Sequence, residues 1–138
     1  MKKVYLAGAV DGLSRKQARG WRIGAAEVLR KAGYVTIDPT LITNPSLAHD
    51  AEDVVRDCFR GVAEADILLV EMSRKNHGYI GTATEMHWAW TQRKPIIVWG
   101  TANRHSLFLQ CYATRFFDTL EEAIAHIIDW RDKYDQRK

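Results

Sequence analysis

Residues 65–72, with the sequence ADILLVEM, form a near-continuous apolar run at the middle of the chain. Such a run, without regular polar alternation, is typical of a strand that is buried on both faces of a parallel sheet. A strand of this kind needs neighbouring strands and a cover of helices. The run therefore indicates an α/β fold with a parallel sheet at its centre.

Strand-like and helix-like stretches alternate along the rest of the chain. Three more short runs indicate strands, at 4–8 (VYLAG), 34–39 (YVTIDP) and 94–100 (KPIIVWG). Helical periodicity is expected over about 14–32, 51–64, 82–93 and 119–130. Strands joined by helices of this length predict right-handed crossovers between parallel strands. We expect a Rossmann-like three-layer α/β sandwich, whose mostly parallel sheet has four or five strands.

The chain has 138 residues, of which 46% are hydrophobic and 27% are charged. These values are typical of a folded domain of ordinary size, which buries its core without metals or disulfides. We therefore predict a single domain over residues 1–138. The net charge of +3 and the pI near 8.9 weakly favour an anionic partner, and they fit a phosphorylated metabolite at least as well as nucleic acid.

Several classes of site find no support in the sequence. Cys58 and Cys111 stand far apart without a CxxC motif, and the histidines form no HExxH pattern, so no metal is expected. The stretch GAVDG at 8–12 is not GxGxxG, and neither GKS nor GKT follows it, so we expect no dinucleotide and no cofactor. The apolar run after the first lysines is too short for a signal peptide or a membrane span. A cytoplasmic protein without a membrane partner is therefore expected.

Polar or glycine-rich segments follow each expected strand. In open parallel sheets, ligands bind at the carboxyl ends of the strands. Asp11 and Ser14 follow the first strand, and Asp38 and Asn44 follow the second, where polar side chains either satisfy local backbone or touch a ligand. A ligand is expected along the edge that is formed by 8–12, 38–46, 73–81 and 100–106.

Glu85 follows a glycine-rich stretch and stands near the start of an expected helix. The sequence TATE that ends at Glu85 matches a capping box, in which the glutamate binds the backbone amide of the first residue. The same position would place a carboxylate at the positive end of the helix dipole, which favours the ionised form that a nucleophile requires. Gly78 and Gly81 would let backbone approach a ligand closely and adopt a positive φ. The spacing alone leaves both roles of Glu85 open.

Asp57 lies in the middle of an expected helix, where aspartate is a poor helix former. The plainer interpretation is a surface acid that pairs with Arg56 or Arg60. The alternative is a carboxylate that takes part in chemistry.

Three segments, in this order, resemble the nucleoside 2-deoxyribosyltransferase family: VYLAGAVDG (4–12), RDCFRGVAEADILLVEM (56–72) and GYIGTATEMHWAW (78–90). The family has a first strand that ends in a YLAGP-like turn, then an aspartate ahead of an "AD" pair and a buried strand, and then a glutamate after a glycine turn. Residues 5–8 match the first motif, Asp57 with 65–66 the second, and 81–85 the third. The resemblance spans most of the chain and implies a domain of this type over 1–138.

The resemblance implies cleavage of the N-glycosidic bond of a 2′-deoxyribonucleoside or its 5′-monophosphate. Glu85 would attack C1′, and Asp57 would contact the departing base or assist its protonation. Such cleavage passes through an oxocarbenium-like state, which a carboxylate stabilises or captures covalently. The residues that the resemblance implies in substrate binding are Tyr5, Gly8, Asp11, Gly78, Tyr79, Gly81 and Ser106.

Some positions depart from the family pattern or bear on the substrate. Ala9 stands where proline is common, and Tyr79 stands where transferases tend to have aspartate and nucleotide-cleaving members serine. Ser106 falls about where transferases carry asparagine and nucleotide hydrolases serine, both of which reach into a neighbouring subunit. This serine favours a 5′-monophosphate slightly, as do the basic residues after the first turn, which could equally form a solvated helix face: Arg15, Lys16, Arg19 and Arg22.

Several functional alternatives stay open. Transfer to another base or attack by water depends on how well the site excludes water. A catalytically silent nucleotide-binding module is the alternative function, since the fold alone does not decide. A nucleic-acid-binding domain ranks last, because no basic stripe with interleaved aromatics is present. A homo-oligomer is expected, since Trp88 and Trp90 point about 200° apart on one helix and one of them should meet another subunit or line a pocket.

Overall fold

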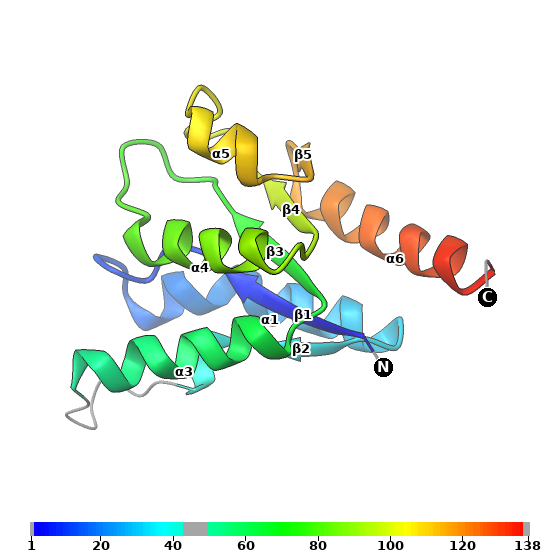
Figure 1. The fold of residues 1–138 in the computed structure, drawn as a ribbon, viewed down its shortest axis with the longest axis horizontal. Helices are drawn as coiled ribbons and strands as arrows, with labels where there is room; N and C mark the ends of the chain where they lie inside the picture. Colours follow the sequence, from blue (N-terminus) through cyan, green and yellow to red (C-terminus); the bar gives the residue numbers. More distant parts are fainter. Residues whose placement is uncertain (1, 43–49, 137–138) are drawn as a thin grey trace.

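The computed structural model describes residues 2–42 and 50–136, and its centre is a five-stranded sheet (Figure 1). The strands are β1 (Lys3–Ala7), β2 (Val35–Ile37), β3 (Ile67–Glu71), β4 (Ile96–Trp99) and β5 (Arg115–Phe117). Their order is β2-β1-β3-β4-β5, and each neighbouring pair is parallel. The predicted Rossmann-like α/β sandwich is therefore confirmed.

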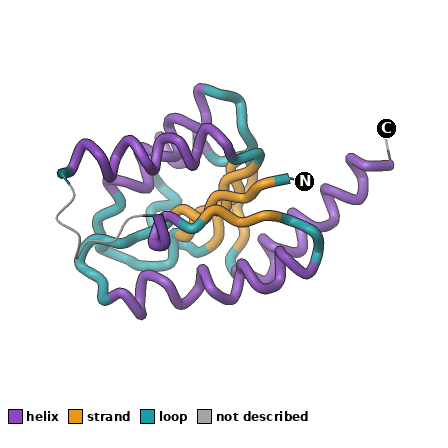
Figure 2. The backbone as a smooth tube through the Cα atoms, turned by 90° about the horizontal axis from the view of Figure 1, so that it is seen from below, coloured by secondary structure: helices purple, strands orange, loops and turns teal. Residues whose placement is uncertain are grey.

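Helices cover both faces of the sheet. They are α1 (Arg15–Lys31), α2 (Pro39–Ile42), α3 (Ala51–Glu64), α4 (Ile80–Thr91), α5 (Leu107–Tyr112) and α6 (Leu120–Gln136). α1 and α6 pack on one face, whereas α3 and α4 pack on the other, and Figure 2 shows the strands between these two layers. Within the described residues, no helix is long and apolar enough to cross a membrane.

The two central strands face both helical layers. β3 is buried along its whole length, as the apolar run predicted. In β1 the side chains alternate, so that Val4 and Leu6 face α1 and α6 while Tyr5 and Ala7 face α3 and α4. The Tyr5 side chain therefore lies under α3 and α4.

α4 begins earlier than the sequence indicated. Its first residue is Ile80 rather than a residue near 82, and its N-cap residue is Tyr79, which makes no side-chain capping bond. The structure therefore excludes the capping-box alternative for Thr82 to Glu85, because both residues lie inside the helix. Glu85 is in the second turn.

Three short elements were not predicted. α2 has four residues, α5 has six and β5 has three, and a hydrophobic period cannot be recognised over so few positions. The last helix also extends beyond the expected end at 130 and reaches Gln136.

The strand order places a switch point between β1 and β3. In a sheet of this order, the chain leaves these two strands toward opposite sides, and ligands bind in the crevice outside their carboxyl ends. Two segments meet there: the β1–α1 turn (residues 8–14) and the β3–α4 loop (residues 72–79). Asn44, in the expected segment after β2, lies outside the described residues.

α3 comes very close to β1 at Gly61. A Cβ on Gly61 would stand 2.7 Å from Cε2 and 3.1 Å from Cδ2 of Tyr5, and 3.3 Å from Cγ2 of Ile37. Side chains essentially never approach this closely, so the glycine is what allows α3 to rest against the Tyr5 ring.

Gly61→Ala should lower the free energy of unfolding by about 1–3 kcal/mol, because α3 must move away from the Tyr5 ring. The matched control is Gly24→Ala in α1, where no atom lies within 4 Å of the added Cβ. This control should gain about 0.5–1 kcal/mol from the better helix propensity of alanine. Urea denaturation followed by circular dichroism measures both, and a Gly61→Ala protein as stable as the control would contradict the packing argument.

Candidate active site

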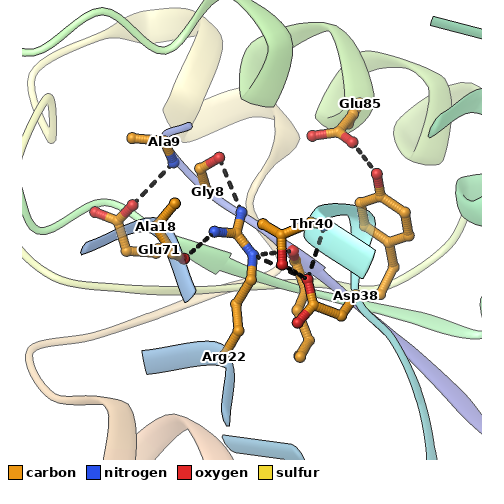
Figure 3. A network of polar contacts seen from close by, with 10 residues as sticks. Gly8, Ala9, Ala18, Arg22, Asp38, Thr40, Glu71 and Glu85 are labelled. Atoms are coloured by element: carbon orange, nitrogen blue, oxygen red, sulfur yellow. Dashed lines mark hydrogen bonds and ion pairs between the residues drawn. The ribbon is translucent and has the colours of Figure 1, made fainter. Parts of the chain in front are cut away.

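A hydrogen bond joins Glu85 of α4 to Tyr5 of β1. The Tyr5 hydroxyl donates to Oε2 of Glu85, although the two residues are 80 positions apart in the sequence. Figure 3 shows Glu85 with this contact as a dashed line. Tyr5 is fully buried and Glu85 is only 8% exposed. The fold therefore holds one carboxylate in a nearly dry site between a strand and a helix.

The surroundings of Glu85 make its charge unfavourable. Burial raises the pKa of Glu85 to about 7, although the hydrogen bond from Tyr5 and the charge of Arg22 lower it. Burial and the neighbouring Glu85 together raise the pKa of Tyr5 above its usual value, so its hydroxyl stays protonated and can donate. The expectation that a helix N-terminus keeps Glu85 ionised is therefore wrong, because Glu85 lies beyond the first turn, where the effect of the dipole has faded.

α3 brings Asp57 and Cys58 toward the same place. Burial and Glu85 raise the pKa of the Cys58 thiol, a hydrogen bond with Tyr5 opposes this rise, and Asp57 adds to it. The Asp57 side chain is 39% exposed, and its Oδ1 lies 4.0 Å from Nη1 of Arg60. Asp57 therefore has the surface ion pair that the sequence allowed, and its charge also acts on the Cys58 thiol beside it.

Glu71 is a second buried carboxylate, at the carboxyl end of β3. Its four hydrogen bonds come from the amide of Ala9 (3.0 Å), the amide and hydroxyl of Ser73 (each 2.7 Å) and the hydroxyl of Tyr79 (2.6 Å). Burial alone would raise the pKa of Glu71, but these hydrogen bonds outweigh it and hold the pKa below its usual value. The sequence analysis missed Glu71, for which an acid at the end of an otherwise apolar strand was the available signal.

Arg22 is fully buried beneath the β1–α1 turn. Its guanidinium donates to the carbonyl oxygens of Leu6 (3.0 Å), Gly8 (3.0 Å) and Ala18, and its Nε lies 3.9 Å from Oδ1 of Asp38 (Figure 3). Burial lowers the pKa of Arg22, and the Asp38 carboxylate opposes this. Arg22 is thus part of the fold and not of a solvated basic face. The sequence signal was its position four residues after Ala18, on the buried stripe of α1.

The β1–α1 turn contains two of the residues expected to bind substrate. A Cβ on Gly8 would stand 2.9 Å from both Cβ and Oε1 of Glu71, so packing of the strands requires this glycine. Asp11 is exposed, and its carbonyl oxygen lies 2.8 Å from Nε2 of His77 in the β3–α4 loop. The two segments are therefore in contact at the switch point.

The glycines before Glu85 are exposed. No atom lies within 4 Å of a Cβ on Gly78 or Gly81, so the space beside them is open. Neither residue has a positive φ, which corrects the expectation of a left-handed turn there. Close approach of a ligand remains the reason a glycine would be useful at these positions.

Tyr79 and Ser106, which were also expected to bind substrate, make hydrogen bonds within the fold. Tyr79 is nearly buried, and its hydroxyl donates to Glu71 and accepts from the amide of Arg74. Ser106 is the N-cap residue of α5, and its hydroxyl accepts from the amide of Leu109 at 3.3 Å. Tyr79 is therefore directed into the sheet edge rather than toward solvent, while Ser106 follows β4 at the same edge.

Large apolar side chains are exposed on α4 and α5. Trp90 is 46% exposed and lies against the Tyr112 ring, whereas Trp88 is half-buried against Phe59. The two tryptophans thus diverge as expected. Near the carboxyl edge, the exposed apolar residues include Val10, Ile80, Leu107 and Phe108. In the described part of the chain, no three metal-binding side chains gather into a cluster.

A comparison with protein families matches residues 2–98 to the model described as Domain of unknown function (DUF4406). A search of curated proteins finds no match.

Similar solved structures support the fold. They include a 2-desoxiribosyltransferase from Leishmania mexicana, at 16% identity and a TM-score of 0.74, covering 94% of this chain and 98% of that chain. A conserved protein from Enterococcus faecalis V583 has 17% identity and a TM-score of 0.72 over 95% and 99% of the chains. The CMP N-glycosidase BcmB from Clostridium botulinum has 14% identity and a TM-score of 0.61 over 91% and 98%. The resemblance to nucleoside 2-deoxyribosyltransferases is confirmed as a shared fold.

Glu85→Gln should change stability in a pH-dependent way. The folded pKa of about 7 lies above the ordinary 4.5, so the native protein loses stability as pH rises from 4.5 through 7. The glutamine side chain has no charge to bury, and its amide oxygen can still accept a hydrogen bond from the Tyr5 hydroxyl. The variant should therefore exceed the native protein by about 1–3 kcal/mol at pH 8, and this advantage should vanish at pH 4.

Urea denaturation at both pH values measures this difference. Glu27→Gln, at an exposed position on α1, is the control and should show no such dependence. An equal effect of Glu85→Gln at pH 4 and pH 8 would show that burial does not oppose the charge of Glu85.

Proposed function

We propose that this chain, which belongs to the family described as Domain of unknown function (DUF4406), cleaves the N-glycosidic bond of a 2′-deoxyribonucleoside or its 5′-monophosphate. The hydrogen-bonded pair of Tyr5 and Glu85 is the observation that carries this proposal. It offers a carboxylate at the switch point of the sheet, where ligands of this fold class bind.

The geometry favours Glu85 over Glu71 as the reacting acid. An ionised carboxylate accepts about four hydrogen bonds, and Glu71 already accepts four. Among the described residues, the hydrogen bond to Glu85 comes from Tyr5 through Oε2. Oε1 of Glu85 is then the atom for attack on a sugar.

In the proposed reaction, Oε1 of Glu85 bonds to C1′ while the C1′–N bond to the base breaks. The electron pair of that bond goes to the base nitrogen, and the base takes a proton with the assistance of Asp57. Water or a second base then attacks C1′ and releases Glu85, which gives hydrolysis or transfer respectively. The Tyr5 hydroxyl keeps the carboxylate oriented between these steps.

The fold comparisons support this choice of reaction class. The chain shares its fold with a desoxiribosyltransferase and a CMP N-glycosidase over almost its whole length. Exposed Arg15 and Lys16 begin α1 directly after the β1–α1 turn, which suits a substrate with a 5′-phosphate. The exposed apolar residues Ile80, Leu107 and Phe108 suit a homo-oligomer in which Ser106 approaches a neighbouring site.

Incubation with a panel of deoxyribonucleosides and their 5′-monophosphates, with and without an acceptor base, should yield products that chromatography identifies. Free base without acceptor indicates a hydrolase, and an exchanged base indicates a transferase. Glu85→Gln should lower kcat by about 1,000-fold or more, because the nucleophile is lost. Asp57→Asn should lower kcat less, since it only assists the leaving base.

The control for this assay is Glu27→Gln, which should keep full activity. Ligand binding without any product in the native protein would instead favour the nucleotide-binding module. Full activity of Glu85→Gln in a productive assay would exclude Glu85 as the nucleophile.

The rate should also depend on pH through Glu85. A nucleophile must be ionised, so kcat/KM should fall about tenfold per pH unit below about 7 and level off above it. Tyr5→Phe removes a hydrogen bond that lowers the pKa of Glu85, so the midpoint should move to higher pH. A pH–rate profile of both proteins measures this, and a flat native profile between pH 5 and 8 would speak against the proposal.

A further inference from the structure

We infer that Glu71 is a positioning residue of this site: it bonds both to the turn that follows β1 and to the start of α4, and so fixes Glu85 relative to Tyr5. This inference rests on the proposed function for its kinetic consequence. Its structural basis is separate, because Glu71 lies on β3, whereas Tyr5 is on β1 and Glu85 on α4.

Glu71 binds each of the two elements that hold the pair. Its Oε1 accepts from the amide of Ala9, which lies two residues after the end of the strand that carries Tyr5. Its Oε2 accepts the hydroxyl of Tyr79, the N-cap residue of the helix that carries Glu85. One carboxylate thus connects β1 and α4 at the edge where the site is proposed.

The start of α4 depends on this contact. The N-cap residue makes no side-chain bond to the first-turn amides, so the helix is not fixed by an ordinary cap. Instead, the Tyr79 hydroxyl reaches back to Glu71 at 2.6 Å and accepts from the amide of Arg74 at 3.0 Å. A helix moves as a rigid body over this short length, so a shift at Tyr79 displaces Glu85 from Tyr5.

Glu71 cannot itself take part in the reaction. It already accepts four hydrogen bonds, three at Oε2 and one at Oε1, and it is only 2% exposed. The close approach of Gly8 to Oε1 leaves no space for a substrate atom on that side. Its effect therefore has to pass through the groups that it holds.

Tyr79→Phe tests the inference, because it removes one hydroxyl and keeps the ring. Its matched control is Tyr34→Phe at the amino end of β2, where a buried hydroxyl donates to the carbonyl oxygen of Ile127 at 2.9 Å. Both variants should lose stability. With the substrate found in the product assay, Tyr79→Phe should lower kcat about tenfold or more with KM changed less than about threefold, while Tyr34→Phe keeps kcat.

A second readout does not need a substrate. Carbon-13 NMR of labelled glutamate carboxyl groups follows the titration of Glu85. The signal of Glu85 is assigned as the one that is missing from the spectrum of Glu85→Gln. In Tyr79→Phe the pKa of Glu85 should fall from about 7 toward 4.5, because a loosened α4 admits water and relieves the burial that raises it. Burial is the largest influence on this pKa, so its relief outweighs the loss of the Tyr5 hydrogen bond, which alone would raise the pKa. In Tyr34→Phe it should not move.

Unchanged kcat and unchanged titration of Glu85 in Tyr79→Phe, at a stability loss like that of Tyr34→Phe, would overturn the inference and leave Glu71 a merely structural residue. If the native protein turns over no nucleoside or nucleotide, the proposed function fails, and the NMR titration still decides whether Glu71 positions Glu85. Glu71→Gln places an N–H donor among the four groups that donate to this side chain. It should lower the pKa of Glu85 more than Tyr79→Phe does.

Discussion

The hydrogen bond from Tyr5 to Glu85 joins a buried strand to the helix across from it, and the arrangement around it raises the pKa of the carboxylate. Burial opposes the charge of Glu85, whereas Tyr5 and Arg22 favour it, and the balance places the pKa at about 7. A group with this pKa changes protonation state at neutral pH, which suits nucleophilic or acid–base work. The same burial is unfavourable for the folded state, so the proposed function of Glu85 and the stability of the fold oppose each other at this position.

The rest of the structure keeps that pair in place. Gly61 lets α3 lie against the Tyr5 ring, and Arg22 fixes the backbone around the β1–α1 turn by donating to the carbonyl oxygens of Leu6, Gly8 and Ala18. Glu71 differs from Glu85 in a useful way, since four donors satisfy it and hold its pKa low. Two buried carboxylates therefore stand near one sheet edge, one fully bonded and ionised and the other with a single described partner and a raised pKa. This difference is the basis for the proposed roles, in which Glu71 supports the site and Glu85 reacts.

The fold was largely predictable from the sequence, because the apolar run of β3 and the alternation of strands and helices are strong local signals. Glu85 and Asp57 could be named from the resemblance to a known family, but the sequence could not decide whether Glu85 belongs to a capping box. A spacing of residues shows which amides are near, and it does not show that Tyr79 starts the helix one turn ahead of Glu85. The burial of Glu71 and Arg22 was not predicted, because a charged side chain is buried only where it finds hydrogen-bond partners. Those partners, such as Ala9 for Glu71 and Leu6 for Arg22, lie far away in the sequence.

The central claim is that Glu85 forms a bond to the sugar. The most direct measurement is mass spectrometry of the protein quenched in acid during turnover and then digested with pepsin. The account predicts that the peptide containing Glu85 carries one 2-deoxyribosyl group, with its phosphate if the substrate is a 5′-monophosphate, and that the Glu85→Gln protein carries none. A sugar attached to a different residue, or attached to the Glu85→Gln protein as well, would contradict it.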